Sequence, residues 1–219
     1  CCGHGTLRVW NWCCRTGSTL GLFIPEAHMS QQSSYLATLE RHRKTFAVME
    51  EHQEAVEQLL ELTRQSLKRG GKIIFLGNGG SAADAQHLAT ELMGGMTSHD
   101  RKPIPSIALT TDSSFLTAWS NDTDFESVFS RQVQGLGQPE DVLVGITTSG
   151  NSDNVIAAIK QAKYKNMKTV VLTGQSGGMI KDLADITIYI PSNNTQRIQE
   201  AHIMTGQIIC GLIEENLLS

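Results

Sequence analysis

The sequence lacks the features of several protein classes. No apolar run reaches the roughly 18 residues that a membrane-spanning helix needs. Its 18 basic residues do not outnumber its 22 acidic ones, and a net charge of -4 gives no indication of nucleic-acid binding. No linker, low-complexity stretch or internal repeat divides the region after residue 33. These absences favour a single folded domain with neither membrane nor nucleic-acid partners, and 219 residues suffice for its core.

Cysteine is scarce outside the first 28 residues. Residues 1–28 contain Cys1, Cys2, Cys13 and Cys14, and they show neither helical nor strand periodicity. They begin with Cys, and His28-Met29-Ser30 reads like a cloning junction followed by a natural start. We therefore expect residues 1–28 to be a disordered leader of cloning origin, with the domain spanning 29–219.

Two alternatives for the leader stay open. A signal peptide would need a longer apolar stretch than residues 20–25 offer, and a metal-binding knuckle would need better-spaced cysteines. Without the leader only Cys210 remains, which is the cysteine usage of a reducing compartment. We therefore expect a cytoplasmic protein.

The spacing of apolar residues predicts an α/β fold. Residues 33–69 have helical spacing, with a break near Glu51 and His52 and a C-cap at Gly70-Gly71. Five short apolar runs follow, at 72–76, 106–110, 141–146, 169–173 and 186–190, and a helical pattern covers 196–218. We expect a single doubly wound, flavodoxin-like domain with a five-stranded parallel sheet at 71–219. Its helical extension at 29–70 can pack on the sheet or against another subunit.

A loop rich in hydroxyl groups follows the third apolar run. It consists of Thr147, Thr148, Ser149, Gly150, Asn151 and Ser152. Hydroxyl groups and backbone N–H groups at the start of a helix make a phosphate-binding site. The loop contains no Lys, so it is not a Walker A loop. The sequence thus predicts a phosphate on a ligand other than a nucleoside triphosphate.

A second glycine-rich loop follows the first apolar run. It consists of Gly77, Asn78, Gly79, Gly80 and Ser81. It formally fits the dinucleotide fingerprint, but the expected acidic residue is misplaced, because Asp112 lies far beyond the usual spacing. A tight turn without a ligand is another interpretation. We favour a sugar-phosphate loop, because the hydroxyl-rich loop is expected at a neighbouring strand end.

Polar residues on two predicted helices are candidates for a metal site. His87 and Glu91 are one helical turn apart, so they can share a divalent cation such as zinc or form an ordinary surface pair. Gln199, His202 and Gln207 lie on the last helix, where they are either ligands or part of a solvated face.

Asn121 and Asp122 form a polar pair after the second apolar run. Asp122 is placed either to accept hydrogen bonds from sugar hydroxyls or to cap the following helix, and capping is favoured.

Together these segments resemble the phosphoheptose isomerases of the sugar-isomerase (SIS) domain family. The matching segments are 77–81, His87 with Glu91, 121–122, 147–152, 172–174 and 197–200. The resemblance extends from about residue 33 to the C-terminus. Each motif is modest alone, but their order and spacing are specific.

The resemblance implies conversion of sedoheptulose 7-phosphate to D-glycero-D-manno-heptose 7-phosphate, in the synthesis of the heptose precursor of lipopolysaccharide. It also implies a homotetramer with active sites at subunit interfaces and one zinc ion per subunit. By motif match the phosphate is held by Ser81, Thr147, Ser149 and Ser152, with Thr148 alongside. The sugar is lined by Asn78, Gly79, Gly80, Asn121, Asp122 and Gln199. The implied metal ligands are His87, Glu91, Gln199 and Gln207, with Glu91 and Gln207 at the catalytic positions.

One position departs from the family pattern. The family has a His, both metal ligand and catalytic acid or base, where this chain has Gln207. A Gln oxygen can coordinate a cation, but it cannot exchange a proton at neutral pH. We therefore expect impaired turnover, unless His202 substitutes from the same helix. The sequence leaves open whether Gln207 is natural or introduced.

The implied reaction proceeds through an enediol(ate), with Glu91 taking a proton from C1 and a metal supplying positive charge. The alternative is a non-catalytic SIS regulator that binds the replication initiator. That relative lacks a His at the position of Gln207 and a Glu at the position of Glu91. The presence of His87, Glu91 and Gln199 favours the enzyme.

Overall fold

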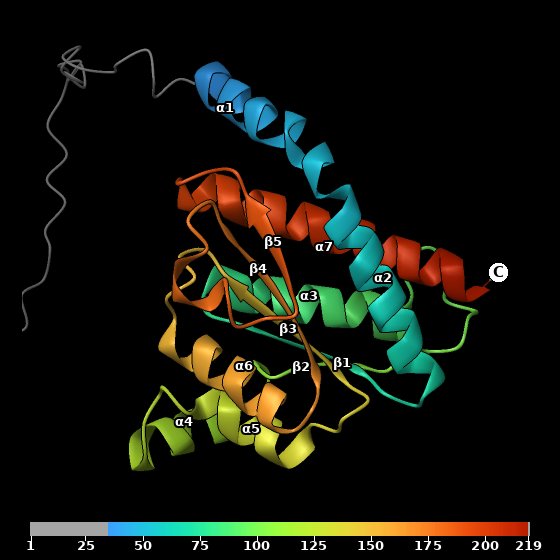
Figure 1. Ribbon diagram of the computed structural model, residues 1–219, viewed down its shortest axis with the longest axis vertical. Helices are drawn as coiled ribbons and strands as arrows, with labels where there is room; N and C mark the ends of the chain where they lie inside the picture. The colour runs from blue at the N-terminus through green and yellow to red at the C-terminus, as the bar shows by residue number, and fades with distance from the viewer. Residues whose placement is uncertain (1–34, 219) are drawn as a thin grey trace, which may run out of the picture.

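The computed structural model describes residues 35–218, so the expectations for residues 1–28 lie outside the described residues. One parallel sheet with the strand order β2-β1-β3-β4-β5 forms the centre (Figure 1). Its strands are β1 (Ile73–Gly77), β2 (Ser106–Ala108), β3 (Val142–Thr147), β4 (Lys168–Gly174) and β5 (Ile186–Ile190). The predicted five-stranded parallel sheet is therefore confirmed.

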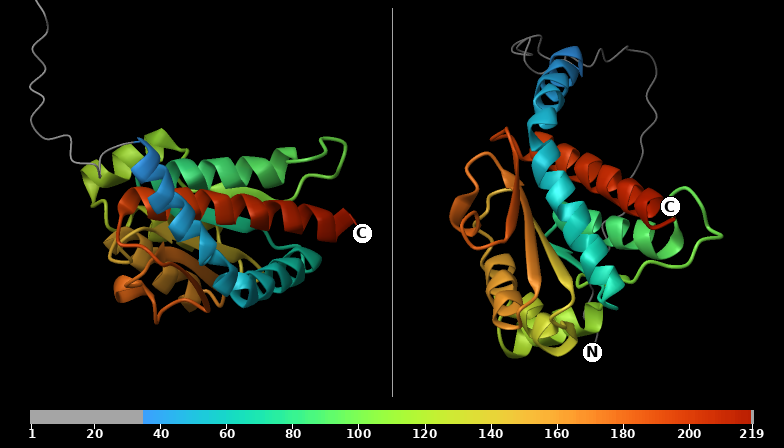
Figure 2. Two further views of the ribbon diagram at one scale, coloured as in Figure 1. Left: turned by 90° about the horizontal axis from the view of Figure 1, so that it is seen from above. Right: turned by 45° about the vertical axis from the view of Figure 1, so that its right-hand side comes forward.

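Helices cover both faces of the sheet because successive strand residues are apolar on both sides. Val142, Val144 and Ile146 of β3 join one buried cluster, whereas Leu143 joins the other. The first face carries α2 (Gln53–Lys68), α3 (Gly80–Gly94) and α7 (Thr195–Leu218). The second carries α4 (Ser113–Asp122), α5 (Val128–Leu136) and α6 (Asp153–Tyr164), as Figure 2 shows. The chain is thus a doubly wound three-layer domain.

The helical extension consists of α1 (Tyr35–Ala47), the short 3-10 helix η2 (Met49–His52) and α2. The predicted break near Glu51 and His52 is confirmed. The end of α2 is a Schellman motif, in which Gly70 has φ 84° and the Gly71 N–H donates to the Ser66 carbonyl over 3.0 Å. Whereas α2 packs on the sheet, α1 stands away from it and meets the start of α7 (Figures 1 and 2).

The second strand is shorter than predicted. It ends at Ala108 rather than at Thr110. Beyond it the chain turns toward α3, where Gln86 Nε2 donates to the carbonyl and to the hydroxyl of Thr110, each over 3.1 Å. A side-chain contact from α3 therefore replaces the strand pairing.

Two helices that carry predicted site residues, α3 and α7, run side by side and parallel. Gly80 faces Gln199 at one end and Gly206 faces Leu88 in the middle. A Cβ at Gly206 would lie 2.5 Å from Leu88 Cδ1, so glycine is needed for this close approach. None of the helices within residues 35–218 combines the length and apolar composition that a membrane span requires.

Candidate active site

The two glycine-rich loops lie side by side at the carboxyl edge of the sheet. Strands β1 and β3 are neighbours, with Gly77 opposite Ile146. The chain leaves β1 for α3 on one face and β3 for α6 on the other. This is the topological switch point, where doubly wound folds bind ligands.

Two helix N-termini meet at this point without side-chain caps. The N-cap of α3 is Gly79, with φ 56°, and the N-cap of α6 is Ser152. The Ser152 hydroxyl lies 3.0 Å from the Thr147 hydroxyl instead of capping its own helix. At the start of α6 the first N–H group that bonds within the helix is that of Ile156, so the N–H groups before it are left for a ligand. At the start of α3 the Ser81 and Ala82 N–H groups already donate to the Asn78 and Gly79 carbonyls, which leaves the Gly80 N–H. The positive ends of the two helix dipoles favour an anion.

The hydroxyl-rich loop is held in shape by the chain after β4. Gly150 has φ 68°, and a Cβ there would overlap the Gly177 carbonyl oxygen. Asn151 Oδ1 accepts the Met179 N–H over 2.9 Å, and the Thr148 carbonyl accepts the Gly174 N–H over 3.1 Å. Ser149 is exposed, and its Oγ accepts the Asn151 N–H over 3.1 Å. The loop is thus preformed around an open side.

A pair of amides joins the two loops. Asn78 Nδ2 donates to Asn154 Oδ1 over 2.8 Å, and Asn154 Nδ2 donates to Asn78 Oδ1 over 2.9 Å. Sequence reasoning missed Asn154, which is buried at the start of α6. Because the Asn78 amide is engaged in this pair, the exposed backbone of Gly79 and Gly80 is the more accessible part of the loop. Ser81, the next residue, is buried.

Three of the four predicted metal ligands come together between α3 and α7. His87 Nε2 lies 2.9 Å from Glu91 Oε1 and 3.4 Å from Gln207 Nε2. Tetrahedral coordination with bonds of about 2.0–2.2 Å separates ligand atoms by roughly 3.3–3.6 Å. A small opening of the His87–Glu91 pair and a turn of the Gln207 amide toward its oxygen would therefore fit one divalent cation.

The fourth predicted ligand is placed apart from this trio. The Gln199 amide lies against Gly80, where a Cβ would be 2.5 Å from its Nε2. Gly80 is about two turns before His87 on α3, so the Gln199 side chain would have to move along α3 to join the trio. Within residues 35–218 no three His, Cys, Asp or Glu side chains form a metal cluster, so a metal here needs glutamine amides.

His202 cannot substitute for the missing histidine. It is fully buried, and neither ring nitrogen has a hydrogen-bond partner among the described residues. Burial lowers its pKa to about 4, and the nearby Thr173 backbone acts in the opposite direction. Its buried ring lies near the Thr173 backbone of β4. The expectation that it could serve from the same helix is therefore wrong: at neutral pH it is an uncharged core residue.

Asn121 and Asp122 are the last residues of α4, not a segment before a helix. Both are exposed and joined by a 2.8 Å hydrogen bond from Asn121 Nδ2 to Asp122 Oδ1. The expected capping by Asp122 is wrong, since Asp124 accepts the Ser127 N–H before α5. Asp112 caps α4 by accepting the Phe115 N–H over 2.9 Å, which leaves no ribose-binding carboxylate there.

A further carboxylate, missed from the sequence, lies one turn before His87. Burial raises the pKa of Asp84 to about 6, and the nearby His87 acts in the opposite direction. Its Oδ2 is buried with no hydrogen-bond partner among the described residues. The signal in the sequence was its position, because Asp84, His87 and Glu91 follow one face of α3.

Comparison with known proteins yields one family and a consistent set of relatives. Residues 34–174 match the SIS domain family. The chain is 51% identical over 176 residues to a phosphoheptose isomerase of a Nitratiruptor species, covering 80% of this chain and 94% of that one. Relatives with this name give no support to the alternative of a non-catalytic regulator.

Two solved structures agree with the fold. A phosphoheptose isomerase from Neisseria gonorrhoeae matches with a TM-score of 0.77 and 43% identity, over 82% of this chain and 96% of that chain. One from Francisella tularensis matches with a TM-score of 0.81 and 33% identity, over 85% and 100%. The likeness therefore covers the whole sheet and its helices.

Proposed function

The chain belongs to the phosphoheptose isomerases of the SIS domain family, and on this basis we propose that it isomerises sedoheptulose 7-phosphate to D-glycero-D-manno-heptose 7-phosphate. Membership makes it an isomerase. The observation that best supports the substrate is the pair of uncapped helix N-termini beside a preformed hydroxyl-rich loop, with His87 and Glu91 on the helix that leaves it.

The phosphate of the substrate would bind across the two loops. The hydroxyl groups of Thr147, Ser149 and Ser152 and the first N–H groups of α6 are its donors. Ser81 and the backbone of Gly80 approach from the first loop. This anchor would extend the sugar along α3 toward Glu91, so the distal phosphate would fix the position of C1 and C2.

Glu91 is the proposed base. Its carboxylate is 21% exposed, and its Oε1 lies 2.9 Å from His87 Nε2. It would take a proton from C1 of the open-chain ketose and return one to C2.

His87, Glu91 and Gln207 would hold a divalent cation, with Gln199 as a fourth ligand after a rearrangement. When bound, such a cation supplies positive charge next to the oxygen of the enediolate. One imidazole, one carboxylate and amide oxygens are compatible with zinc, although softer nitrogen ligands bind it better.

Gln207 would make turnover slow. It keeps a contact to His87, so it can complete the site, but it has no proton to exchange at neutral pH. If the position serves as an acid or base, its loss costs on the order of 10²–10⁴-fold in rate. Deuterium exchange provides a specific test: in D₂O the ketose should exchange its C1 proton faster than aldose forms, and equal rates would contradict the proposal.

The proposed assembly is a cytoplasmic homotetramer in heptose synthesis for lipopolysaccharide. Its support is an apolar groove between η2, α2 and α7, lined by Met49, Val56, Leu60, Met204 and Ile208. Ile208 is 50% exposed in this groove, so a second copy would cover it. Light scattering should give four times the chain mass, and a monomer that turns over substrate would contradict this assembly.

An assay on sedoheptulose 7-phosphate tests the proposed function. The purified chain with added zinc should form the aldose phosphate, and a chelator should slow it. Glu91→Gln, which removes the base at almost unchanged size, should abolish the residual activity. Product formation that is unaffected by Glu91→Gln would contradict the proposed role, and no product from the unchanged chain would contradict the proposed function.

A further inference from the structure

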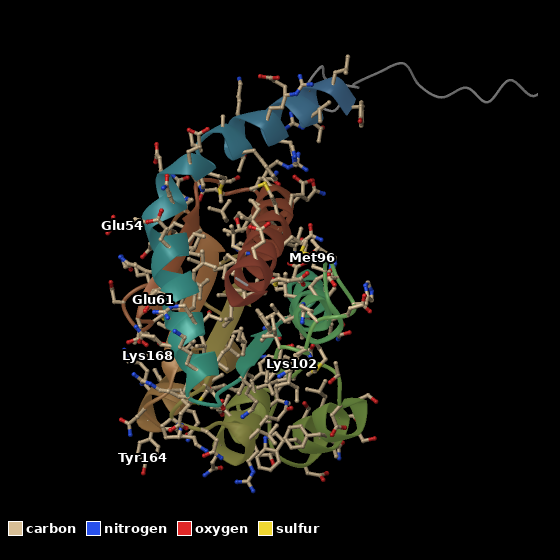
Figure 3. The ribbon with its side chains drawn as sticks, turned by 90° about the vertical axis from the view of Figure 1, so that its right-hand side faces the viewer. Glu54, Glu61, Met96, Lys102, Tyr164 and Lys168 are labelled. Atoms are coloured by element: carbon tan, nitrogen blue, oxygen red, sulfur yellow. The ribbon has the colours of Figure 1, made fainter. Side chains whose placement is uncertain are left out.

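A buried ion pair joins α7 to the loop after α3. Arg101 Nε donates to Glu214 Oε2 over 2.7 Å, and the two side chains are 2% and 1% exposed. Glu214 also accepts the Met96, Thr97 and Ser98 N–H groups over 2.9, 3.0 and 3.1 Å, together with the Thr97 hydroxyl. One carboxylate thus gathers the donors of three consecutive residues in a loop that runs beside the C-terminal part of α7 (Figure 3).

The hydrogen-bond donors around Glu214 determine the direction in which its pKa is shifted. Burial works to raise the pKa of Glu214, but hydrogen bonds from Thr97, Met96 and Arg101 outweigh it and hold the pKa well below its usual range. Glu214 is therefore ionised whenever the domain is folded near neutral pH. A charged carboxylate with several donors is a rigid attachment point, because each charge-assisted hydrogen bond is strong and directional.

Arg101 also contacts the end of α3 near the proposed metal ligands His87 and Glu91. Its Nη2 donates to the Glu91 carbonyl over 2.9 Å and to the Leu92 carbonyl over 2.8 Å. These carbonyls belong to the last turn of α3, where most helix carbonyls have no partner further along the helix. The Glu91 carbonyl also accepts the Gly95 N–H over 3.1 Å, which ends the helix. Glu91 is therefore fixed through its own backbone.

Glu214 lies on α7, the helix that carries Gln207. It follows Gln207 by about two turns of α7, so both side chains leave the same face of that helix. Between these levels the Cys210 thiol lies 3.8 Å from the Leu88 carbonyl, so the two helices are in contact there. The Arg101–Glu214 ion pair thus fixes the spacing between α3 and α7 near Glu91 and Gln207.

We propose that Arg101 and Glu214 are positioning residues that set the distance between the ligands on α3 and the ligand on α7. The inference rests on the proposed function, because it concerns the metal end of the isomerase site. Neither residue touches the reacting atoms in this account. Each acts through the backbone of Glu91 or through the axis of α7.

A second ion pair with a buried carboxylate provides the control. Lys72 Nζ lies 2.6 Å from Asp141 Oδ2, and Asp141 is 1% exposed. Asp141 also accepts the Lys72 and Gln138 N–H groups, over 2.9 and 2.8 Å. This pair lies at the start of β1 and β3, at the edge of the sheet opposite the ligand. Asp141→Asn should therefore destabilise the fold without disturbing the metal end.

The experiment is a titration of the full chain with Co²⁺, read by its visible absorption, for the unchanged chain, Glu214→Gln and Asp141→Asn. Outer contacts to metal ligands typically change metal affinity by 10–100-fold. Glu214→Gln should lose at least tenfold in affinity and show an altered band shape, whereas Asp141→Asn should keep both at a similar loss of thermal stability. Equal affinity and band shape in Glu214→Gln would overturn the inference.

A double variant, Arg101→Met with Glu214→Leu, guards against failure to fold. It avoids the unpaired buried charge that a single substitution leaves, although the Met96, Thr97 and Ser98 N–H groups lose their acceptor, so its thermal stability is matched against that of Asp141→Asn. It also lacks the guanidinium bonds to the α3 carbonyls, so its cobalt affinity should still fall at least tenfold. A double variant with unchanged cobalt binding would overturn the inference. Absence of cobalt binding by the unchanged chain would overturn it too, whereas turnover of sedoheptulose 7-phosphate by that preparation would leave the proposed function standing.

Discussion

The two ends of the candidate site are built in different ways. At the phosphate end the donors are backbone N–H groups and short hydroxyl side chains, and their shape comes from glycines such as Gly150 and Gly177. At the metal end the donors are long side chains of His87, Glu91 and Gln207, which two separate helices bring together. The first end depends on local backbone conformation and the second on helix packing.

The difference determines which substitutions each end tolerates. A hydroxyl can be removed from the phosphate end while the N–H groups remain, but an added Cβ at a positive φ changes the whole loop. At the metal end the ligand atoms themselves cannot be replaced. Small substitutions at other positions of α3 and α7 should be tolerated. Changes in backbone conformation at the phosphate end should therefore weaken substrate binding, and side-chain substitutions at the metal end should slow turnover.

Gly150→Ala should have the largest effect on the phosphate end. The new Cβ would overlap the Gly177 carbonyl oxygen, and φ 68° is strained for alanine, so about 1–3 kcal/mol of the loop's stability is lost. The KM for sugar phosphate should rise by about 10²-fold, measured by initial rates. Cobalt affinity should stay unchanged, and a parallel loss of cobalt binding would break the distinction between the ends.

Protonation of His202 should weaken both ends together, because it is a fully buried residue of α7. Its pKa is lowered from 6.5 to about 4, so the unfolded chain binds a proton first as the pH falls. Stability from this residue is complete above pH 6.5 and falls by about 3 kcal/mol by pH 4.

Urea unfolding of the chain and of His202→Leu isolates this effect. Asp84, with its pKa raised to about 6, loses stability as the pH rises and so acts in the opposite direction over the same range. That contribution cancels in the difference between the two proteins. The difference should change by about 3 kcal/mol between pH 6.5 and pH 4, and parallel stability curves would contradict the assignment.

Asn154→Ala should have a smaller effect on the junction of the two loops. It removes both amide hydrogen bonds to Asn78, each worth about 0.5–1.5 kcal/mol. The KM should rise roughly tenfold with kcat less affected, as steady-state kinetics would show. Asn154→Asp, which keeps one acceptor but adds a negative charge beside the phosphate site, should raise the KM further than Asn154→Ala. A fall in kcat with unchanged KM would instead link Asn154 to the metal end.

Ser152→Ala should have the smallest effect. It removes one hydroxyl contact to Thr147, but the N–H groups of α6 remain in place. The KM should rise by only a few-fold, consistent with about 1 kcal/mol for one hydrogen bond. An effect as large as that of Gly150→Ala would show that hydroxyl groups, rather than the backbone, dominate this end.

The same division explains what the sequence could predict. The phosphate end is local: its glycines, hydroxyls and strand ends adjoin in the chain, so both loops and the sheet could be predicted. The spacing of His87 and Glu91 is also local. The Asn78–Asn154 pair, the Arg101–Glu214 bridge and the position of Gln199 against Gly80 depend on contacts between distant segments. No spacing rule reveals those contacts, and Asn121 and Asp122 were misplaced because the end of α4 carries no clear stop signal.

The most direct test compares the unchanged chain with Gln207→His, measuring both the Kd for sedoheptulose 7-phosphate by calorimetry and kcat with zinc. An intact phosphate end predicts Kd values within about threefold of each other, since a distant substitution leaves its hydrogen bonds in place. A metal end limited by Gln207 predicts that kcat rises by about 10²-fold or more. An unchanged kcat in Gln207→His, with zinc bound, would contradict the account.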